Sequence, residues 1–368
     1  MQIFFYVKNL MTTLKANATH SRQIYIWLLF CAGMIFCMIV LGGVTRLTHS
    51  GLSMVEWKPL MGIIPPLSDQ DWQDSFQKYQ LFPEYQKVNK GMSIEEYKYI
   101  FMYEYLHRIL GRIIGIIFLI PFLFFYFTGR IQEKLTPKLL AIFALGGFQG
   151  LLGWYMVKSG LINNPSVSQY RLTAHLGNAV VIYSYILWVA FGLMGERKAS
   201  FIRSVSDIGK LLRVSAYTIT ALLFLMILSG GFVAGTRAGL AYSTFPLMGE
   251  TFVPSGLYSM MPFWLAAFED VTTIQFNHRI LAYVLFVIVC SFSINALYRL
   301  KSIELRAGVV CMAVLLITQI CLGIATILMH VPVVFAAAHQ ATAVALLTAS
   351  LFLSRSFCDI KKILQTTG

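Results

Sequence analysis

The sequence is short of charge. Only 12% of its 368 residues are Asp, Glu, Lys or Arg, whereas 57% are hydrophobic, and the mean hydropathy is +0.69. A typical soluble domain carries about twice that share of charged residues, so this composition excludes a soluble globular protein. A lipid bilayer must therefore be the main solvent of the chain.

Long apolar runs are plentiful. A helix that crosses the roughly 30 Å hydrocarbon core needs about 20 largely apolar residues. Eight stretches meet this requirement, at residues 23–43, 100–127, 138–158, 171–193, 212–235, 275–297, 307–329 and 333–354. The sequence therefore predicts an all-α membrane protein with eight transmembrane helices.

Acidic residues are scarce, with 16 against 29 basic residues and a net charge of +13. Most basic residues fall in alternate connections, at 8–22, 130–138, 197–213, 299–306 and 355–362, and cytoplasmic loops retain positive charge during insertion. We therefore expect both termini to be cytoplasmic and the basic segments to lie against anionic headgroups. No nucleic-acid motif is present. The short N-terminal leader favours a bacterial inner membrane over a mitochondrial one, and we expect the first span to be retained because no cleavage site follows it.

None of the six cysteines lies in an outer connection. A structural disulfide is therefore not expected.

The chain repeats itself. GGVTRLTHSGLSMVEWKPLMG from Gly42 resembles GGFVAGTRAGLAYSTFPLMG from Gly230, and EYLHRIL at 104–110 resembles QFNHRIL at 275–281. Gln149 and Gly153 likewise match Gln319 and Gly323. The repeat predicts two parallel four-helix-bundle units, because an even number of spans returns the chain to the same side. Their expected bounds are 23–193 and 212–355, with a cytoplasmic linker at 194–211, an N-terminal segment at 1–22 and a tail at 356–368.

Two features of the first unit concern its packing. Gly146, Gly147, Gly150 and Gly153 in the third span would let neighbouring helices approach closely. The long outer loop, residues 44–99 with Trp57 and Trp72, is expected to cap the outer face. Its stretch Met92–Tyr99 suggests a short interfacial helix that leads into the second span.

Four of the seven histidines lie on even-numbered spans near the outer surface: His107, His175, His278 and His339. A lone intramembrane histidine most often bonds to a neighbouring helix. Two matched histidines in each repeat instead indicate two copies of one two-ligand site. Imidazoles on facing bundle helices are common axial ligands of heme iron, whereas zinc would need further ligands that are absent here. The other three, His20, His49 and His330, are expected to be solvated or locally hydrogen-bonded.

Charged neighbours of these histidines suggest roles of their own. Arg108 and Arg279 directly follow a histidine and could bind heme propionates, although each could instead reach lipid phosphates. Glu104 lies three residues before His107, on one helix face with it. The matching residue is Gln275, which lacks an ionisable proton, so catalytic chemistry would belong with Glu104. The alternative is that Glu104 only pairs with Arg108.

The motifs EYLHRILGRIIG at 104–115 and GLAYSTFPLMG at 239–249 resemble the heme A synthase family, and the resemblance covers about residues 22–355. It implies an oxidoreductase that converts a ring methyl of heme O to the formyl group of heme A for cytochrome oxidase, by successive hydroxylation. By the same resemblance, His107 and His175 flank the substrate heme O, with Glu104 catalytic. His278 and His339 would ligate the iron of a resident heme B that passes electrons.

The resemblance also implies heme O synthase and the cytochrome oxidase assembly machinery as partners, with a homo-oligomer possible. This chain lacks the cysteine pair that one branch of the family has in its first outer loop, so it resembles the branch shared by proteobacteria and mitochondria. Two other functions stay open at this point. A bis-His cytochrome b that acts only in electron transfer would use the same ligands without Glu104. A transporter ranks lower, because broken helices and midplane charges are missing.

Overall fold

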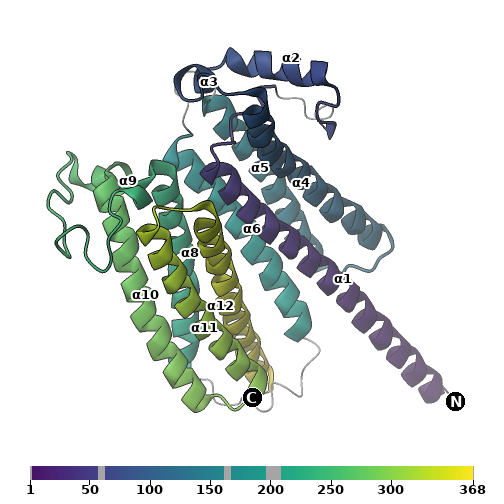
Figure 1. Cartoon of the computed structure of the whole chain (residues 1–368). Helices are drawn as coiled ribbons and strands as arrows, with labels where there is room; N and C mark the ends of the chain where they lie inside the picture. The colour runs from purple at the N-terminus through teal and green to yellow at the C-terminus, as the bar shows by residue number, and fades with distance from the viewer. Residues whose placement is uncertain (1, 57–62, 161–166, 196–208, 368) are drawn as a thin grey trace.

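A computed structural model describes the backbone of residues 2–56, 63–160, 167–195 and 209–367, and the side chains of 19–56, 63–160, 167–193 and 209–358. Within these residues the fold is helical and has no β-strand. Eight helices among the described residues are long and apolar enough to cross a membrane, which confirms the predicted all-α membrane fold with eight spans. They are α1 (Gln2–Leu47), α4 (Ile94–Phe127), α5 (Thr136–Gly160), α6 (Gln169–Gly195), α8 (Lys210–Thr236), α10 (Val271–Arg299), α11 (Ile303–Leu328) and α12 (Val333–Thr367) (Figure 1).

The long helices have the same neighbours in each half of the chain. In the first half, α1 packs against α4 and α6, and α5 packs against α4 and α6. In the second half, α8 packs against α10 and α12, and α11 packs against α10 and α12. The halves meet where α6 contacts α8 and α12, and where α1 contacts α12. We call this contact region the seam.

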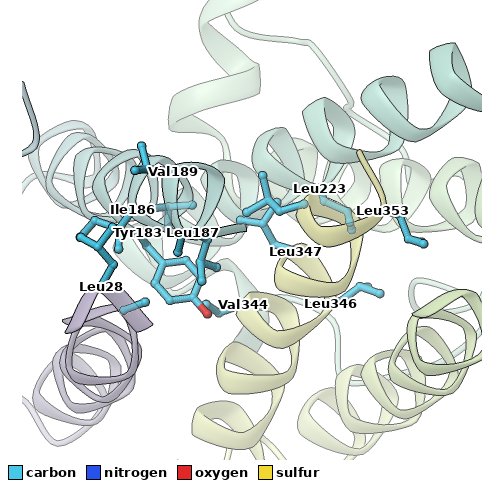
Figure 2. Close-up of a cluster of buried hydrophobic side chains, with 14 of the residues drawn as sticks. Leu28, Tyr183, Ile186, Leu187, Val189, Leu223, Val344, Leu346, Leu347 and Leu353 are labelled. Atoms are coloured by element: carbon cyan, nitrogen blue, oxygen red, sulfur yellow. The ribbon is translucent and has the colours of Figure 1, made fainter. Parts of the chain in front are cut away.

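A buried apolar core fills the part of the bundle nearer the two chain termini. Leu28 from α1, Ile186 from α6 and Leu347 from α12 are almost fully buried in it (Figure 2). The Tyr183 hydroxyl lies 2.7 Å from the Thr348 hydroxyl and so joins α6 to α12 inside this core. Burial of many such side chains stabilises the seam. The four candidate histidines lie nearer the opposite end.

Two short helices, α2 (Asp69–Gln80) and α3 (Pro83–Lys87), lie across the end of α4 that is remote from the chain termini (Figure 1). We call residues 63–93 the cap. A capping box of Ser68 and Asp71 begins α2, because each side chain accepts a backbone N–H of the other residue. Phe76 and Tyr79 of α2 pack on Tyr97 of α4, with ring centroids 5.1 Å apart in both pairs.

The loop folds over the first turns of α4, but its predicted interfacial helix is not found as such. The predicted interfacial helix at Met92–Tyr99 is not a separate element. A second capping box, Ser93 with Glu96, begins α4 at Ile94, and the helix then continues into the span. Trp57 and the sequence PLMG at 59–62 lie outside the described residues.

Three of the four glycines of α5 do not act as predicted. Outside the nearby backbone of α5 itself, no atom of the described residues lies within 4 Å of a Cβ built on Gly146, Gly147 or Gly150, so these positions mediate no close approach to another described helix. The fourth, Gly153, does make a close contact, and its partner is the His175 ring. The six cysteines are all unpaired.

Candidate functional site

The four histidines lie on four different helices, two in each half: α4 and α6 in the first, α10 and α12 in the second. His175, His278 and His339 lie within about two turns of the start of α6, α10 and α12, at 1.5 Å per residue. His107 lies further along its helix, because α4 begins inside the cap. His107 and His175 are close enough to interact electrostatically, and so are His278 and His339. The structure therefore brings together the two pairs that the repeat predicted.

A glycine of a neighbouring helix faces each imidazole ring. A Cβ built on Gly42 would lie 3.1 Å from Cε1 of His107, and one on Gly153 would lie 3.0 Å from Cε1 of His175. In the second half, the corresponding distances are 3.6 Å from Gly230 to His278 and 2.8 Å from Gly323 to His339. Ordinary carbon contacts are about 3.5–4.0 Å, so at three of the four positions a methyl group would displace the ring.

In the second half, the Nδ1 atoms of both histidines have hydrogen-bond partners. His278 Nδ1 lies 3.1 Å from the Ser229 hydroxyl of α8. His339 Nδ1 lies 3.0 Å from the backbone carbonyl of Gln319 on α11. A proton on Nδ1 of His339 satisfies that carbonyl and leaves Nε2 with its lone pair, as a metal-ligating histidine requires. These partners fix the orientation of both rings.

The first half lacks these contacts. Nδ1 of His107 and Nδ1 of His175 are buried, and neither has a hydrogen-bond partner in the described part of the chain. Gln149 of α5, the counterpart of Gln319, donates through Nε2 to the His175 backbone carbonyl at 3.0 Å and lies 3.4 Å from the ring Nε2. Buried polar atoms without partners are uncommon in native proteins and often mark functional positions. The two rings of the first half are therefore less constrained than those of the second.

Glu104 of α4 is buried and fully engaged. Its Oε2 accepts hydrogen bonds from the Ser53 hydroxyl and the Met54 backbone N–H, both at 2.8 Å, and its Oε1 pairs with Arg108 at 2.5 Å. Arg108 also donates to the Met54 carbonyl at 3.0 Å. Glu104 and Arg108 together therefore hold the segment that follows α1 against α4.

The second half contains the same connection without the charge. Gln275 Oε1 accepts the backbone N–H of Tyr242 at 3.1 Å, and Gln275 Nε2 donates to the Tyr242 carbonyl at 2.9 Å. Arg279 donates to the Tyr242 carbonyl at 3.1 Å and to the Leu247 carbonyl at 3.2 Å. Tyr242 follows a Gly-Leu pair at the same place as Met54. An amide is thus sufficient to hold the loop, and the carboxylate of Glu104 is an additional property of the first half.

Both arginines are directed to backbone carbonyls of loops rather than to the histidines. Each is one residue beyond its histidine, which is about 100° around the helix. Arg279 is almost fully buried, and its Nε has no partner. This guanidinium keeps donor capacity for an anionic group, while Arg108 already has an acid beside it.

A second buried carboxyl lies close to Glu104. Glu84 of α3 is buried in the cap, and its Oε2 has no hydrogen-bond partner. Burial raises the pKa of Glu84 to about 8, and the negative charge of Glu104 adds to the effect. Glu84 therefore carries its proton at neutral pH. The sequence does not indicate a role for Glu84, because nothing in the loop predicts that α3 folds onto the first half.

Sequence analysis also missed the roles of Ser229 and of the glycines that face the rings. The signal for two of them was present, since the repeat paired Gln149 and Gly153 with Gln319 and Gly323. Residues i and i+4 share one helix face, so these pairs had to face one neighbour. His49 and His330 are exposed, and His49 Nδ1 lies 3.3 Å from Arg237.

The residues present fit a heme in each half. Two buried imidazoles in each half, each beside a glycine of a neighbouring helix, could hold a heme through its iron. No group of three His, Cys, Asp or Glu side chains that could hold a bare metal ion occurs among the described residues.

Eight apolar helices with a pair of inward histidines in each half define a class of polytopic membrane proteins with candidate heme sites between helices. The chain belongs to the COX15-CtaA family, cytochrome oxidase assembly protein, which it matches over residues 25–351. It is 50% identical to the heme A synthase of Nitrosospira multiformis over 91% of this chain and 93% of the relative. It is 49% identical to that of Nitrosomonas eutropha, over 91% and 94% respectively. The family resemblance inferred from the motifs is confirmed.

Proposed function

We propose that this protein is an oxidoreductase that converts heme O to heme A by oxidising one ring methyl to a formyl group. Membership of the cytochrome oxidase assembly family and relatives named heme A synthase support this function over a cytochrome b that only transfers electrons. The observation that carries the proposal is the pairing of four histidines, two in each half, with a carboxylate in one half and an amide at the matching place in the other.

The two halves divide the labour in this proposal. The units at 23–193 and 212–355 each hold one heme. His278 and His339, whose rings are oriented by Ser229 and Gln319, suit a resident heme B. A bound heme B would supply one-electron chemistry to the first half.

His107 and His175, with unpartnered Nδ1 atoms, suit a substrate that must enter and leave. Glu104 is the proposed catalytic group of the first half. It lies about one helical turn before His107 on α4, so in this proposal its carboxylate is the acid–base group nearest the substrate ring. Arg108 balances the Glu104 charge, and Arg279 offers its Nε to a propionate of the second heme.

The membrane setting of the proposal follows the charge pattern. The protein is placed in a bacterial inner membrane with both termini cytoplasmic, and with the linker at 194–211 on the same side. Heme O would come from its synthase, and heme A would pass to cytochrome oxidase assembly. A homo-oligomer is compatible with this arrangement.

Glu104→Gln tests the proposed function. The matching Gln275 shows that an amide can hold the loop, so the variant should fold and keep its hemes. Loss of the carboxyl should lower heme A formation by about 100-fold or more. Gln275→Glu is the matched control, and it should keep its activity. Pigments extracted from cells that make heme O report the outcome. Unchanged heme A in Glu104→Gln would remove Glu104 from the chemistry, and no heme A from the wild type would refute the function.

A further inference from the structure

The two adjacent glycines of α1 face different partners. Gly42 faces the His107 ring of its own half. A Cβ on Gly43 would overlap the side-chain amide of Gln340, which comes from α12 across the seam. The same amide donates through Nε2 to the Ile39 carbonyl at 2.8 Å. The α1 stretch from Ile39 to Gly43 therefore contacts α12 on one side and His107 on the other.

The repeat provides a matched case on α8. Gly230 faces His278 of its own half. A Cβ on Gly231 would lie 2.9 Å from Oγ1 of Thr173 and 3.4 Å from Cδ2 of Leu176, both on α6 across the seam. Leu176 follows His175 just as Gln340 follows His339. Each double glycine thus touches a histidine of its own half and the residue next to a histidine of the other half. The contact through Gln340 includes a hydrogen bond, whereas the Thr173 hydroxyl beside Gly231 has no hydrogen-bond partner among the described residues and Leu176 is apolar.

We propose that Gln340 is a positioning residue that couples the two heme sites, so that heme bound at His278 and His339 strengthens porphyrin binding at His107 and His175. This inference rests on the proposed function, because it assumes a heme site in each half. Iron ligation would add a second fixed point to the His339 ring, whose Nδ1 already bonds to the Gln319 carbonyl. The next residue, Gln340, then holds α1 at Ile39 in one register.

The fixed register of α1 acts on the first site through Gly42. Gly42 is in close contact with His107, so an α1 held in one register limits the position of the His107 ring from one side. Binding of a second ligand to a site that is already ordered costs the protein less conformational entropy, and this produces positive coupling between the sites. The apolar contact of Leu176 has no directional bond to a backbone carbonyl, so it constrains α8 less.

The test measures hemin binding to the full-length protein in lipid nanodiscs. The dissociation constant of the first site is measured with the second site filled, in the wild type, and with it empty, in His278→Ala. We expect the filled second site to tighten binding about fivefold or more. We call the dissociation constant with the second site empty, divided by that with it filled, the coupling ratio. Gln340→Leu places at this position the residue type of its counterpart Leu176, and the coupling ratio should fall to about one. The His278→Ala/Gln340→Leu double variant completes the cycle.

Leu176→Ala is the packing control, because it removes seam contact without removing a hydrogen bond. It should keep the ratio, and thermal unfolding of both variants should show that the fold is intact. A ratio near one in the wild type, an unchanged ratio in Gln340→Leu, or an equal loss in Leu176→Ala would each overturn the coupling. A wild type that binds hemin at only one site would refute the proposed function as well, whereas two occupied sites with a ratio of one would refute the coupling alone.

Discussion

Replacement of the glycines that face the imidazole rings should weaken heme binding in an order set by the structure. Gly323→Ala is the most severe case, because the new Cβ would stand 2.8 Å from Cε1 of His339. The ring must move away by about 0.7–1.2 Å to reach an ordinary carbon contact. That displacement also strains the 3.0 Å bond between His339 Nδ1 and the Gln319 carbonyl. Loss of a partner that orients a metal ligand typically costs about 10- to 100-fold in affinity.

The other three glycines should give smaller losses of heme affinity, in the order of their distance from the ring. Gly153→Ala, at 3.0 Å, and Gly42→Ala, at 3.1 Å, should weaken the first site less than Gly323→Ala weakens the second. Gly230→Ala, at 3.6 Å, should change affinity by less than about twofold, because the contact is an ordinary one. Gly147→Ala is the control, since nothing lies within 4 Å of its Cβ.

Hemin titration followed by visible absorption measures each affinity, and thermal unfolding reports the fold. Alanine is a better helix former than glycine by about 1 kcal/mol, so none of the variants should lose stability through the helix backbone. Equal losses of heme affinity in Gly147→Ala and Gly323→Ala, or full heme affinity in Gly323→Ala, would show that the glycines do not position the imidazole rings.

Two further outcomes follow from the second half and the cap. Ser229→Ala removes the hydroxyl beside His278 Nδ1 and should weaken heme at the second site by about tenfold, as measured by hemin titration; unchanged affinity would contradict the assignment. Glu84 keeps its proton in the folded cap up to a pKa of about 8, whereas the unfolded chain releases it near 4.5, so cap stability should fall as pH rises between these values and stay level above them. Glu84→Gln should abolish the dependence of cap stability on pH, as measured by limited proteolysis of the cap. A pH dependence that persists in this variant would assign the titration to another group.

The spans and the histidine pairs were predictable because their signals are local or repeated. An apolar run of about 20 residues is sufficient to identify a crossing helix, and all eight expected spans are present. The repeat indicated which histidines correspond, since His107 and His278 share the sequence HRIL. The division into two four-helix units stays a prediction, although the same helix neighbours recur in both halves.

Contacts between distant segments were not predictable. The capping box at Ser68 could have indicated α2, but where α2 and α3 would pack could not be read from a polar loop. The partners of Glu104, Ser53 and Met54, lie about 50 residues away in sequence. The glycines of α5 show the same limit, because a small residue indicates room for a neighbour without naming it. At Gly153 that neighbour is an imidazole ring rather than a helix backbone.

In the proposed function, the two histidine pairs hold two different hemes. Pigment extraction from His107→Ala and His278→Ala, purified from cells that make heme O, tests this assignment. His107→Ala should lose heme O and heme A but retain heme B, and His278→Ala should lose heme B. Loss of the same pigment from both variants, or a wild type that carries a single kind of porphyrin, would contradict the account.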